Sequence, residues 1–307
     1  MQSTPRTGYL ICLFTAFIWA GTGPLISYLL NTHGVAPLVI AFWRDAIIAV
    51  VCLAGILALR PAWLRLSRSD LQGFALVGTI SIGIYHAIFV TSIAINGAAL
   101  AVVLIYLYPA FVTLGSAVLF KERVGALNII GLLLSLFGCV LLVRAYDPAV
   151  LKVSWLGVLV GVASAVTHAV YVLFSQRSVA RHSPWVSLAF TMLFGALILL
   201  VLTLTVEGPR SLVTVGIGPW PWLVLIFLAL GPTLFGYFLF TTSLRYIPGR
   251  IASLLVVIEA PVATLIAVAF LGERLDGLQI IGMALILLAA VLPGLPFKLG
   301  RTATQVA

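Results

Sequence analysis

The chain has 307 residues, of which 63% are hydrophobic and only 8% are charged. Its mean hydropathy of +1.23 is too high for a soluble globule, because a chain of this size could not bury so much apolar surface. The composition excludes a soluble enzyme and predicts an all-α polytopic membrane protein. The formal net charge of +9 indicates basic cytoplasmic loops rather than a nucleic-acid partner.

Apolar segments follow one another along the whole chain, each near the roughly 20 residues that a helix needs to cross a bilayer. Short linkers separate them, and no linker has the composition of a soluble domain. The first segment lacks a small-residue cleavage site, which favours a retained helix over a signal peptide. We expect ten transmembrane helices, at 8–30, 37–59, 71–95, 98–120, 125–143, 155–177, 184–206, 219–243, 250–271 and 277–296.

The basic residues are distributed unequally between alternate loops. If both termini are cytoplasmic, twelve of the seventeen Lys and Arg residues fall in cytoplasmic loops and four in outer loops, while Arg44 lies within the second segment. Because basic residues gather on the cytoplasmic side, the bias predicts cytoplasmic termini for a multi-pass protein of the cell inner (plasma) membrane.

One half of the chain repeats the other. Residues 122–141 and 273–292 are identical at ten of twenty positions at a constant offset of 151. Five crossings per half is an odd number, so the second half must cross the membrane in the opposite sense. We therefore expect two inverted five-helix repeats, 1–150 and 151–307, the architecture of many secondary transporters with a central binding site.

Each repeat carries an acidic residue beside an arginine at the start of its last helix. We expect Glu122 and Glu273 to satisfy backbone groups of the helix that follows, or to pair with the neighbouring Arg123 and Arg274. Neither is expected to be a transport residue.

A longer motif surrounds these pairs. The second half has Ala252-(x8)-Pro261-(x10)-Gly272-Glu273-Arg274 and then Gln279-Ile280-Ile281-Gly282, and the first has Ala101-(x7)-Pro109-(x12)-Glu122-Arg123 and then Asn128-Ile129-Ile130-Gly131. Together with Ile18-Trp19-Ala20-Gly21 and Phe42-Trp43-Arg44, this pattern resembles the EamA-type carriers of the drug/metabolite transporter (DMT) superfamily. The chain is most similar to the YddG-type bacterial amino-acid exporters among them. Two departures are the acid two residues before Pro261, at Glu259, and Lys121 before Glu122.

Polar and aromatic groups at membrane depth usually face the interior of a helix bundle. Such groups occur in both copies: His86 pairs with Tyr237 and Tyr108 with Glu259 at the offset of 151, and Trp19 pairs with His168 at an offset of 149. For each residue alone, packing in the core is an equally good interpretation. As a set, the residues predict a central substrate-binding cavity formed by Trp19, His86, Tyr106, Tyr108, His168, Tyr171, Tyr237 and Glu259.

Prolines occur within four of the predicted helices. Each removes a backbone donor and frees the carbonyl four residues earlier, which kinks the helix or leaves an acceptor for a ligand; the kink is the favoured interpretation. The four kink or hinge positions are Pro24, Pro109, Pro232 and Pro261. Arg44 could attract a substrate carboxylate, although pairing with an acid or snorkelling outward is favoured.

The predicted cavity is aromatic and contains one acid, Glu259, which suits a zwitterion with an apolar side chain. The hypothesis is a secondary carrier that exports small aromatic or neutral amino acids, or related metabolites, by alternating access; the direction of export rests on the resemblance. A carrier of a drug, nucleobase or sugar derivative, a channel or receptor, and a membrane-embedded enzyme remain alternatives. The histidines and cysteines lack metal spacing, and nucleophile elbows and nucleotide loops are missing from the sequence. We expect no catalytic residues, metal or cofactor, a monomer, and no partners beyond the substrate and the lipid bilayer.

Overall fold

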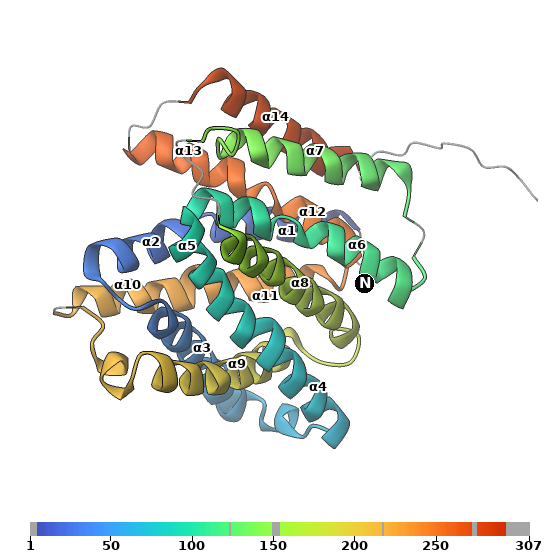
Figure 1. The fold of residues 1–307 in the computed structure, drawn as a ribbon. Helices are drawn as coiled ribbons and strands as arrows, with labels where there is room; N and C mark the ends of the chain where they lie inside the picture. Colours follow the sequence, from blue (N-terminus) through green and yellow to red (C-terminus); the bar gives the residue numbers. More distant parts are fainter. Residues whose placement is uncertain (1–4, 123, 149–153, 217, 272–274, 293–307) are drawn as a thin grey trace, which may run out of the picture.

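The computed structural model of the chain describes residues 5–122, 124–148, 154–216, 218–271 and 275–292, and its regular secondary structure in these ranges is helical (Figure 1). The first half contains α1 (Pro5–Trp19), α2 (Thr22–His33), α3 (Pro37–Leu59), η1 (Pro61–Leu64), α4 (Arg68–Gly78), η2 (Thr79–Ile84), α5 (Tyr85–Ile105), α6 (Tyr108–Leu119) and α7 (Ala126–Leu142). The second half contains α8 (Trp155–Ser178), α9 (Pro184–Val206), η3 (Pro209–Val213), α10 (Trp220–Leu228), η4 (Ala229–Phe235), α11 (Gly236–Ser243), α12 (Gly249–Val256), α13 (Glu259–Leu271) and α14 (Gly277–Val291).

These helices form the ten apolar segments that the sequence predicts. Two of them, α7 and α14, are shorter than a full crossing, and the last four residues of the predicted segment 277–296 lie outside the described residues. The eight segments long enough to cross a membrane are Pro5–His33, Pro37–Leu59, Arg68–Ile95, Leu100–Leu119, Trp155–Ser178, Pro184–Val206, Trp220–Ser243 and Gly249–Ile266.

Local sequence signals set several helix ends. Gly34 adopts a left-handed conformation with φ of 63° and ends α2, a position that a residue with a Cβ occupies only at a cost. Pro37 opens α3 and Pro184 opens α9, where a missing backbone N–H costs nothing. Asp276 accepts a hydrogen bond from the backbone of Gln279 and so caps α14.

Helices are interrupted at equivalent places in the two repeats. The break between α5 and α6 precedes Pro109, and the break between α12 and α13 precedes Pro261. The π-helices η2 and η4 occupy equivalent positions in the third and eighth segments, and η4 contains Pro232. A further break, at the end of α1, lies just before Pro24. Each of the four prolines therefore lies at or next to a helix break or a π-helix, places where a helix can bend.

Two of the carbonyls that these prolines free have found other donors. The carbonyl of Leu228 accepts a hydrogen bond from Oγ1 of Thr233 at 2.8 Å. The carbonyl of Val257 accepts one from the backbone N–H of Ala260 at 3.1 Å. At these two places the structure agrees with a kink rather than with a ligand-binding acceptor.

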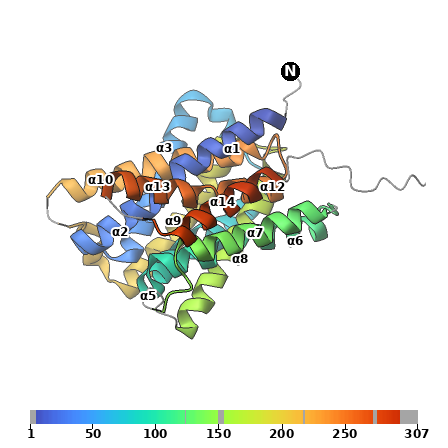
Figure 2. The ribbon, with the colours of Figure 1, turned by 90° about the horizontal axis from the view of Figure 1, so that it is seen from above.

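The repeats meet around a pseudo-two-fold axis. Equivalent helices pair with each other, α3 with α9 and α7 with α14, and both views show α7 beside α14 (Figures 1 and 2). A Cβ added at Gly138 would lie 2.7 Å from the carbonyl oxygen of Gly282, and one added at Gly282 would lie 2.6 Å from that of Gly138. Such reciprocal contact requires glycine on both helices, and it makes the pair of α7 and α14 a tight seam.

Glu122 was expected to bond to the start of α7 or to Arg123; Arg123 lies outside the described residues, and the structure shows other partners for Glu122. Its carboxylate reaches across to the second repeat, where Oε2 accepts a hydrogen bond from Nε of Arg250 at 2.6 Å and Oε1 accepts one from Nε2 of Gln176 at 3.1 Å. The start of α7 is left to Gly125, which makes no side-chain cap. The carboxylate of Glu122 therefore bonds to an arginine that is distant in sequence. Arg123, Glu273 and Arg274 lie outside the described residues.

Candidate binding cavity

A cavity of about 120 Å³ lies at the level of the helix breaks. It is somewhat smaller than an apolar cavity of about 150 Å³ that admits benzene, so a substrate with an aromatic ring would need the cavity to widen. Its walls come from both repeats, and the lining residues are Trp19, Thr22, Gly23, Ser27, Arg44, Tyr85, His86, Phe89, Ile93, Val102, Ile105, Tyr106, Tyr108, His168, Thr233, Tyr237, Val256 and Glu259.

Seven of the eight predicted site residues line this one cavity. The eighth, Tyr171, lies behind the wall, where its ring packs against Tyr237 with centroids 5.2 Å apart. Its hydroxyl shares a hydrogen bond of 2.9 Å with Oγ1 of Thr241. Tyr171 therefore supports the cavity wall instead of facing the space.

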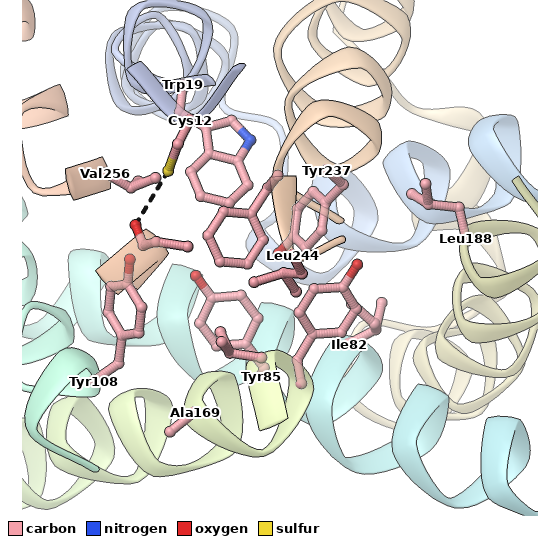
Figure 3. Packing of buried hydrophobic residues seen from close by; sticks show 14 of the residues in the cluster. Cys12, Trp19, Ile82, Tyr85, Tyr108, Ala169, Leu188, Tyr237, Leu244 and Val256 are labelled. Atoms are coloured by element: carbon pink, nitrogen blue, oxygen red, sulfur yellow. Dashed lines mark hydrogen bonds between the residues drawn. The ribbon is translucent and has the colours of Figure 1, made fainter. Parts of the chain in front are cut away.

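Aromatic rings enclose most of the space. The ring of His168 lies between those of Tyr85 and Tyr108, with both centroids 4.7 Å away, and Trp19 meets Tyr237 edge to face at 5.2 Å. Figure 3 shows Trp19, Tyr85, Tyr108 and Tyr237 converging from different helices. Such a box presents both ring faces and ring edges, which suits a flat apolar group.

A hydrogen-bonded chain supports one side of the cavity. Nδ1 of His86 lies 2.8 and 2.9 Å from the two carboxylate oxygens of Asp45, and Nε2 of His86 lies 3.1 Å from the hydroxyl of Tyr237. Asp45 is fully buried behind His86. Since the carboxylate accepts from Nδ1, it fixes the orientation of the imidazole and leaves Nε2 toward Tyr237.

Several polar groups of the lining lack partners. Nε and Nη2 of Arg44, Nδ1 of His168 and Oγ1 of Thr22 are buried without a hydrogen bond. Nε of Arg44 lies 3.8 Å from Oδ1 of Asp45, which is close enough for charge attraction. Among the described residues, the side chain of Glu259 makes no ion pair or hydrogen bond. Buried polar groups are normally satisfied, so a cluster of unsatisfied ones around one space points to a missing ligand or to water.

The cavity is closed at the end of the bundle that holds the chain's N-terminus, which we call the inner end. Sγ of Cys12 donates to the carbonyl of Ala252 at 3.2 Å (Figure 3), and the hydroxyl of Tyr108 donates to that of Ser253 at 3.0 Å. Along α1 and α2 the lining runs from Trp19 to Ser27, away from this end. The structure therefore shows a cavity that extends toward the opposite, outer end.

Sequence reasoning missed part of the site. Tyr85 was not predicted, because two adjacent residues of a regular helix do not face one cavity. Here both Tyr85 and His86 do, directly after the π-helix η2, and a π-turn shifts the phase of the residues that follow. Asp45 was not predicted as part of the site, and the cavity was expected to contain one acid, Glu259. Glu259 is the acid of the lining. Asp45 does not line the cavity, but it contacts His86, which does.

Among the described residues, no group of three His, Cys, Asp or Glu side chains is placed to hold a metal ion. What the cavity offers is an aromatic enclosure, one guanidinium and one carboxylate. Comparison with known proteins identifies the family of the chain.

Residues 6–144 and 155–294 each match the EamA-like transporter family. The chain belongs to this family. The two matches fall in the two halves of the chain, and the protein is a multi-span membrane transporter. The fold is similar to that of a solved crystal structure, with a TM-score of 0.77 and 23% identity, covering 94% of this chain and 97% of that one.

Named relatives of this EamA-like chain span almost its whole length. A "probable amino-acid metabolite efflux pump" of Salmonella typhimurium is 27% identical over 97% of this chain and 98% of its own. A "probable terminal-alkyne amino-acid exporter" of Streptantibioticus cattleyicolor is 28% identical over 89% and 88%. An uncharacterized inner membrane transporter of Salmonella typhimurium is 26% identical over 95% and 96%.

Proposed function

We propose that this EamA-like transporter is a secondary carrier that exports small amino acids with aromatic or other apolar side chains across the bacterial inner membrane. The observation that carries the proposal is the presence of Arg44 and Glu259 in the lining of one aromatic cavity, each with unused binding capacity. Both termini would be cytoplasmic, and the units 1–150 and 151–307 would exchange conformations around the cavity.

A zwitterion matches these groups in sign. The substrate carboxylate would accept charge-assisted hydrogen bonds from Nε and Nη2 of Arg44, and the ammonium would donate to Glu259. The side chain would then pack among Trp19, Tyr85 and Tyr237. Pairing both charges matters, because a charge moved from water into this enclosure without a partner costs several kcal/mol.

Other solute classes fit the lining less well. A polycation would need more than one carboxylate, and Glu259 is the acid among the lining residues. A sugar would need many hydrogen-bond partners, whereas the lining is dominated by rings and aliphatic side chains. The printed names of two relatives, an amino-acid metabolite efflux pump and an amino-acid exporter, point the same way.

Alternating access fits the helix breaks. Kinks near Pro109 and Pro261 occur at equivalent places of the two repeats, and such discontinuities let half-helices move while tightly packed pairs stay fixed. The seam of α7 and α14 would be the fixed part. In the opposite state, the inner contacts of Cys12 and Tyr108 would separate and equivalent contacts would close the outer end.

Analogues that lack one charge test the zwitterion directly. Tryptamine lacks the carboxylate and indole-3-propionate lacks the ammonium. For Arg44→Gln, we expect affinity for tryptophan and indole-3-propionate to fall by about 10- to 100-fold, the effect of losing a hydrogen bond to a charged group, while tryptamine binding is unchanged. Glu259→Gln should show the reverse pattern. Equal effects on all three ligands, in variants that melt like the wild type, would contradict the assignment.

Transport by Glu259→Gln gives a second readout in the same variant. We expect normal insertion and impaired transport, with Glu207→Gln at the end of α9 as the matched control outside the cavity. A Glu259→Gln protein that is inserted normally and transports at the full rate with unchanged pH dependence would remove Glu259 from the mechanism.

A further inference from the structure

A second cavity, of about 440 Å³, lies at the surface of the inner end. Three connections surround it: the one between α3 and α4, the one between α8 and α9, and the one between α11 and α12. Its lining residues are Ala62, Trp63, Arg65, Leu66, Val179, Ala180, Arg181, His182, Ser183, Val186 and Arg245. It is separate from the central cavity, since the two linings share no residue.

Positive charge dominates this surface cavity. Arg65, Arg181 and Arg245 all line it, and none of the three forms an ion pair within the described part of the chain. The nearby acid, Asp70, is engaged by Oγ of Ser67 at 2.6 Å and by Nε2 of His182 at 3.3 Å. Three guanidinium groups around one hollow repel each other until an anion enters it.

One of the arginines is held in place for such a ligand. Nη2 of Arg245 donates to the backbone carbonyl of His182 at 3.1 Å, which anchors the guanidinium at the rim and leaves its other N–H groups available. Guanidinium groups bind phosphate in a bidentate way, so three of them converging on one space match a phosphate better than a carboxylate alone.

The remaining walls of the surface cavity are apolar. Trp63 is 41% exposed beside the arginines, and Leu66, Val179 and Val186 complete that side. Tryptophan is enriched at membrane–water interfaces, because there its ring lies near the acyl chains while its N–H reaches the headgroups. A free inorganic phosphate would use the arginines and leave this wall without a function.

We propose that this surface cavity binds the phosphate headgroup of an anionic phospholipid from the inner leaflet, with the glycerol and the start of the acyl chains against Trp63. Basic pockets between membrane helices on the cytoplasmic side are suited to such lipids. The arginines come from both repeats, Arg65 from the first and Arg181 and Arg245 from the second. A bound headgroup would therefore link the inner ends of the two repeats.

Lipid binding to the purified full-length protein, measured by native mass spectrometry and by titration in detergent, tests the proposal. Phosphatidylglycerol and cardiolipin should bind, and phosphatidylcholine should not compete. Each of Arg65→Gln, Arg181→Gln and Arg245→Gln should weaken phosphatidylglycerol binding about fivefold, and all three together about a hundredfold. Arg210→Gln, at the outer end, is the charge-matched control and should leave binding unchanged.

Further arms separate a lipid from a small anion. Trp63→Ala should weaken phosphatidylglycerol binding and leave binding of inorganic phosphate unaltered. The triple variant could lose its fold. The test therefore rests on those single variants whose melting temperature equals that of the wild type. Equal affinity for phosphatidylglycerol and phosphatidylcholine, unchanged binding in the folded single variants, or full displacement of the lipid by millimolar phosphate would each overturn the proposal.

Discussion

Glu122 and Arg250, 128 positions apart, form an ion pair of 2.6 Å that joins the two repeats at the inner end. Gln176 completes the contact, since its Nε2 donates to Glu122 and its Oε1 accepts from the backbone N–H of Gly249 at 2.7 Å. The closed inner end is thus held by a polar network below the contacts of Cys12 and Tyr108. We call the three side chains Glu122, Gln176 and Arg250 the inner latch.

Weakening the inner latch should open the inner end more often. Cys12 is buried there, so its reaction with a membrane-permeant maleimide reports the opening. In a protein with Cys52 and Cys139 replaced by alanine, we expect Glu122→Gln to speed labelling of Cys12 about fivefold, because a partly exposed ion pair contributes about 1 kcal/mol. Exchange of the pair, Glu122→Arg with Arg250→Glu, should restore slow labelling.

The control for the inner latch is Arg68→Gln, which removes a charge from an exposed position at the same end. A labelling rate that rises as much in Arg68→Gln as in Glu122→Gln would show that the effect comes from general charge and not from the ion pair.

Gly236 determines the position of Trp19. A Cβ added at Gly236 would collide with the indole nitrogen and the adjacent ring carbon of Trp19. Gly236→Ala should push the indole into the cavity and cost about 1–3 kcal/mol of stability, the usual range for overpacking. Transport assays and thermal melting measure both effects. Gly55→Ala, where a new Cβ meets no atom within 4 Å, should leave transport unchanged and should not lower the melting temperature.

Loss of the Asp45 charge should lower the stability of the fold more than loss of the Tyr237 hydroxyl. Asp45→Asn removes the charge that faces His86 and leaves Arg44 without an anion, and breaking a buried charge pair costs about 3–5 kcal/mol. Tyr237→Phe removes one hydrogen bond, worth about 1 kcal/mol. Thermal melting in the same detergent compares them. A smaller loss for Asp45→Asn than for Tyr237→Phe would mean that the carboxylate carries no structural charge.

The helices and the repeat could be predicted from sequence because both depend on patterns along the chain. Apolar length predicts the crossings, and the constant offset of 151 that matches Tyr108 to Glu259 also identifies residues that share one cavity. An inverted two-fold axis brings equivalent mid-membrane positions together, so the repeat supplies spatial information that a single sequence otherwise lacks.

What could not be predicted depends on helix phase and on distant partners. The π-turn before Tyr85 changes which side chains face inward, and hydropathy does not reveal it. Asp45 joins the site only because α5 and α3 are neighbours, which places His86 beside it. Glu122 was expected to bond locally, yet Arg250 reaches it from the other repeat. Long-range pairings of this kind leave no periodic signal in one sequence.

The orientation of the bundle, which we predict from its basic loops, is open to direct labelling. Single cysteines at Arg65 and Arg210 lie at opposite ends of the bundle, and both arginines are exposed. In intact cells, an impermeant maleimide should label the cysteine at position 210 and spare that at position 65, because arginine-rich loops stay in the cytoplasm. Labelling of position 65 alone would reverse the assignment of the inner and outer ends.

The central claim is that the aromatic cavity with Arg44 and Glu259 carries amino acids. Counterflow in proteoliposomes measures this most directly, with a panel of amino acids, nucleobases, sugars and cationic drugs as the internal solute. We predict that phenylalanine, tryptophan, methionine or threonine exchanges faster than putrescine or a nucleotide sugar, and that Trp19→Ala shifts the preference among the amino acids. Robust exchange of putrescine or a nucleotide sugar without any amino-acid flux would contradict the account.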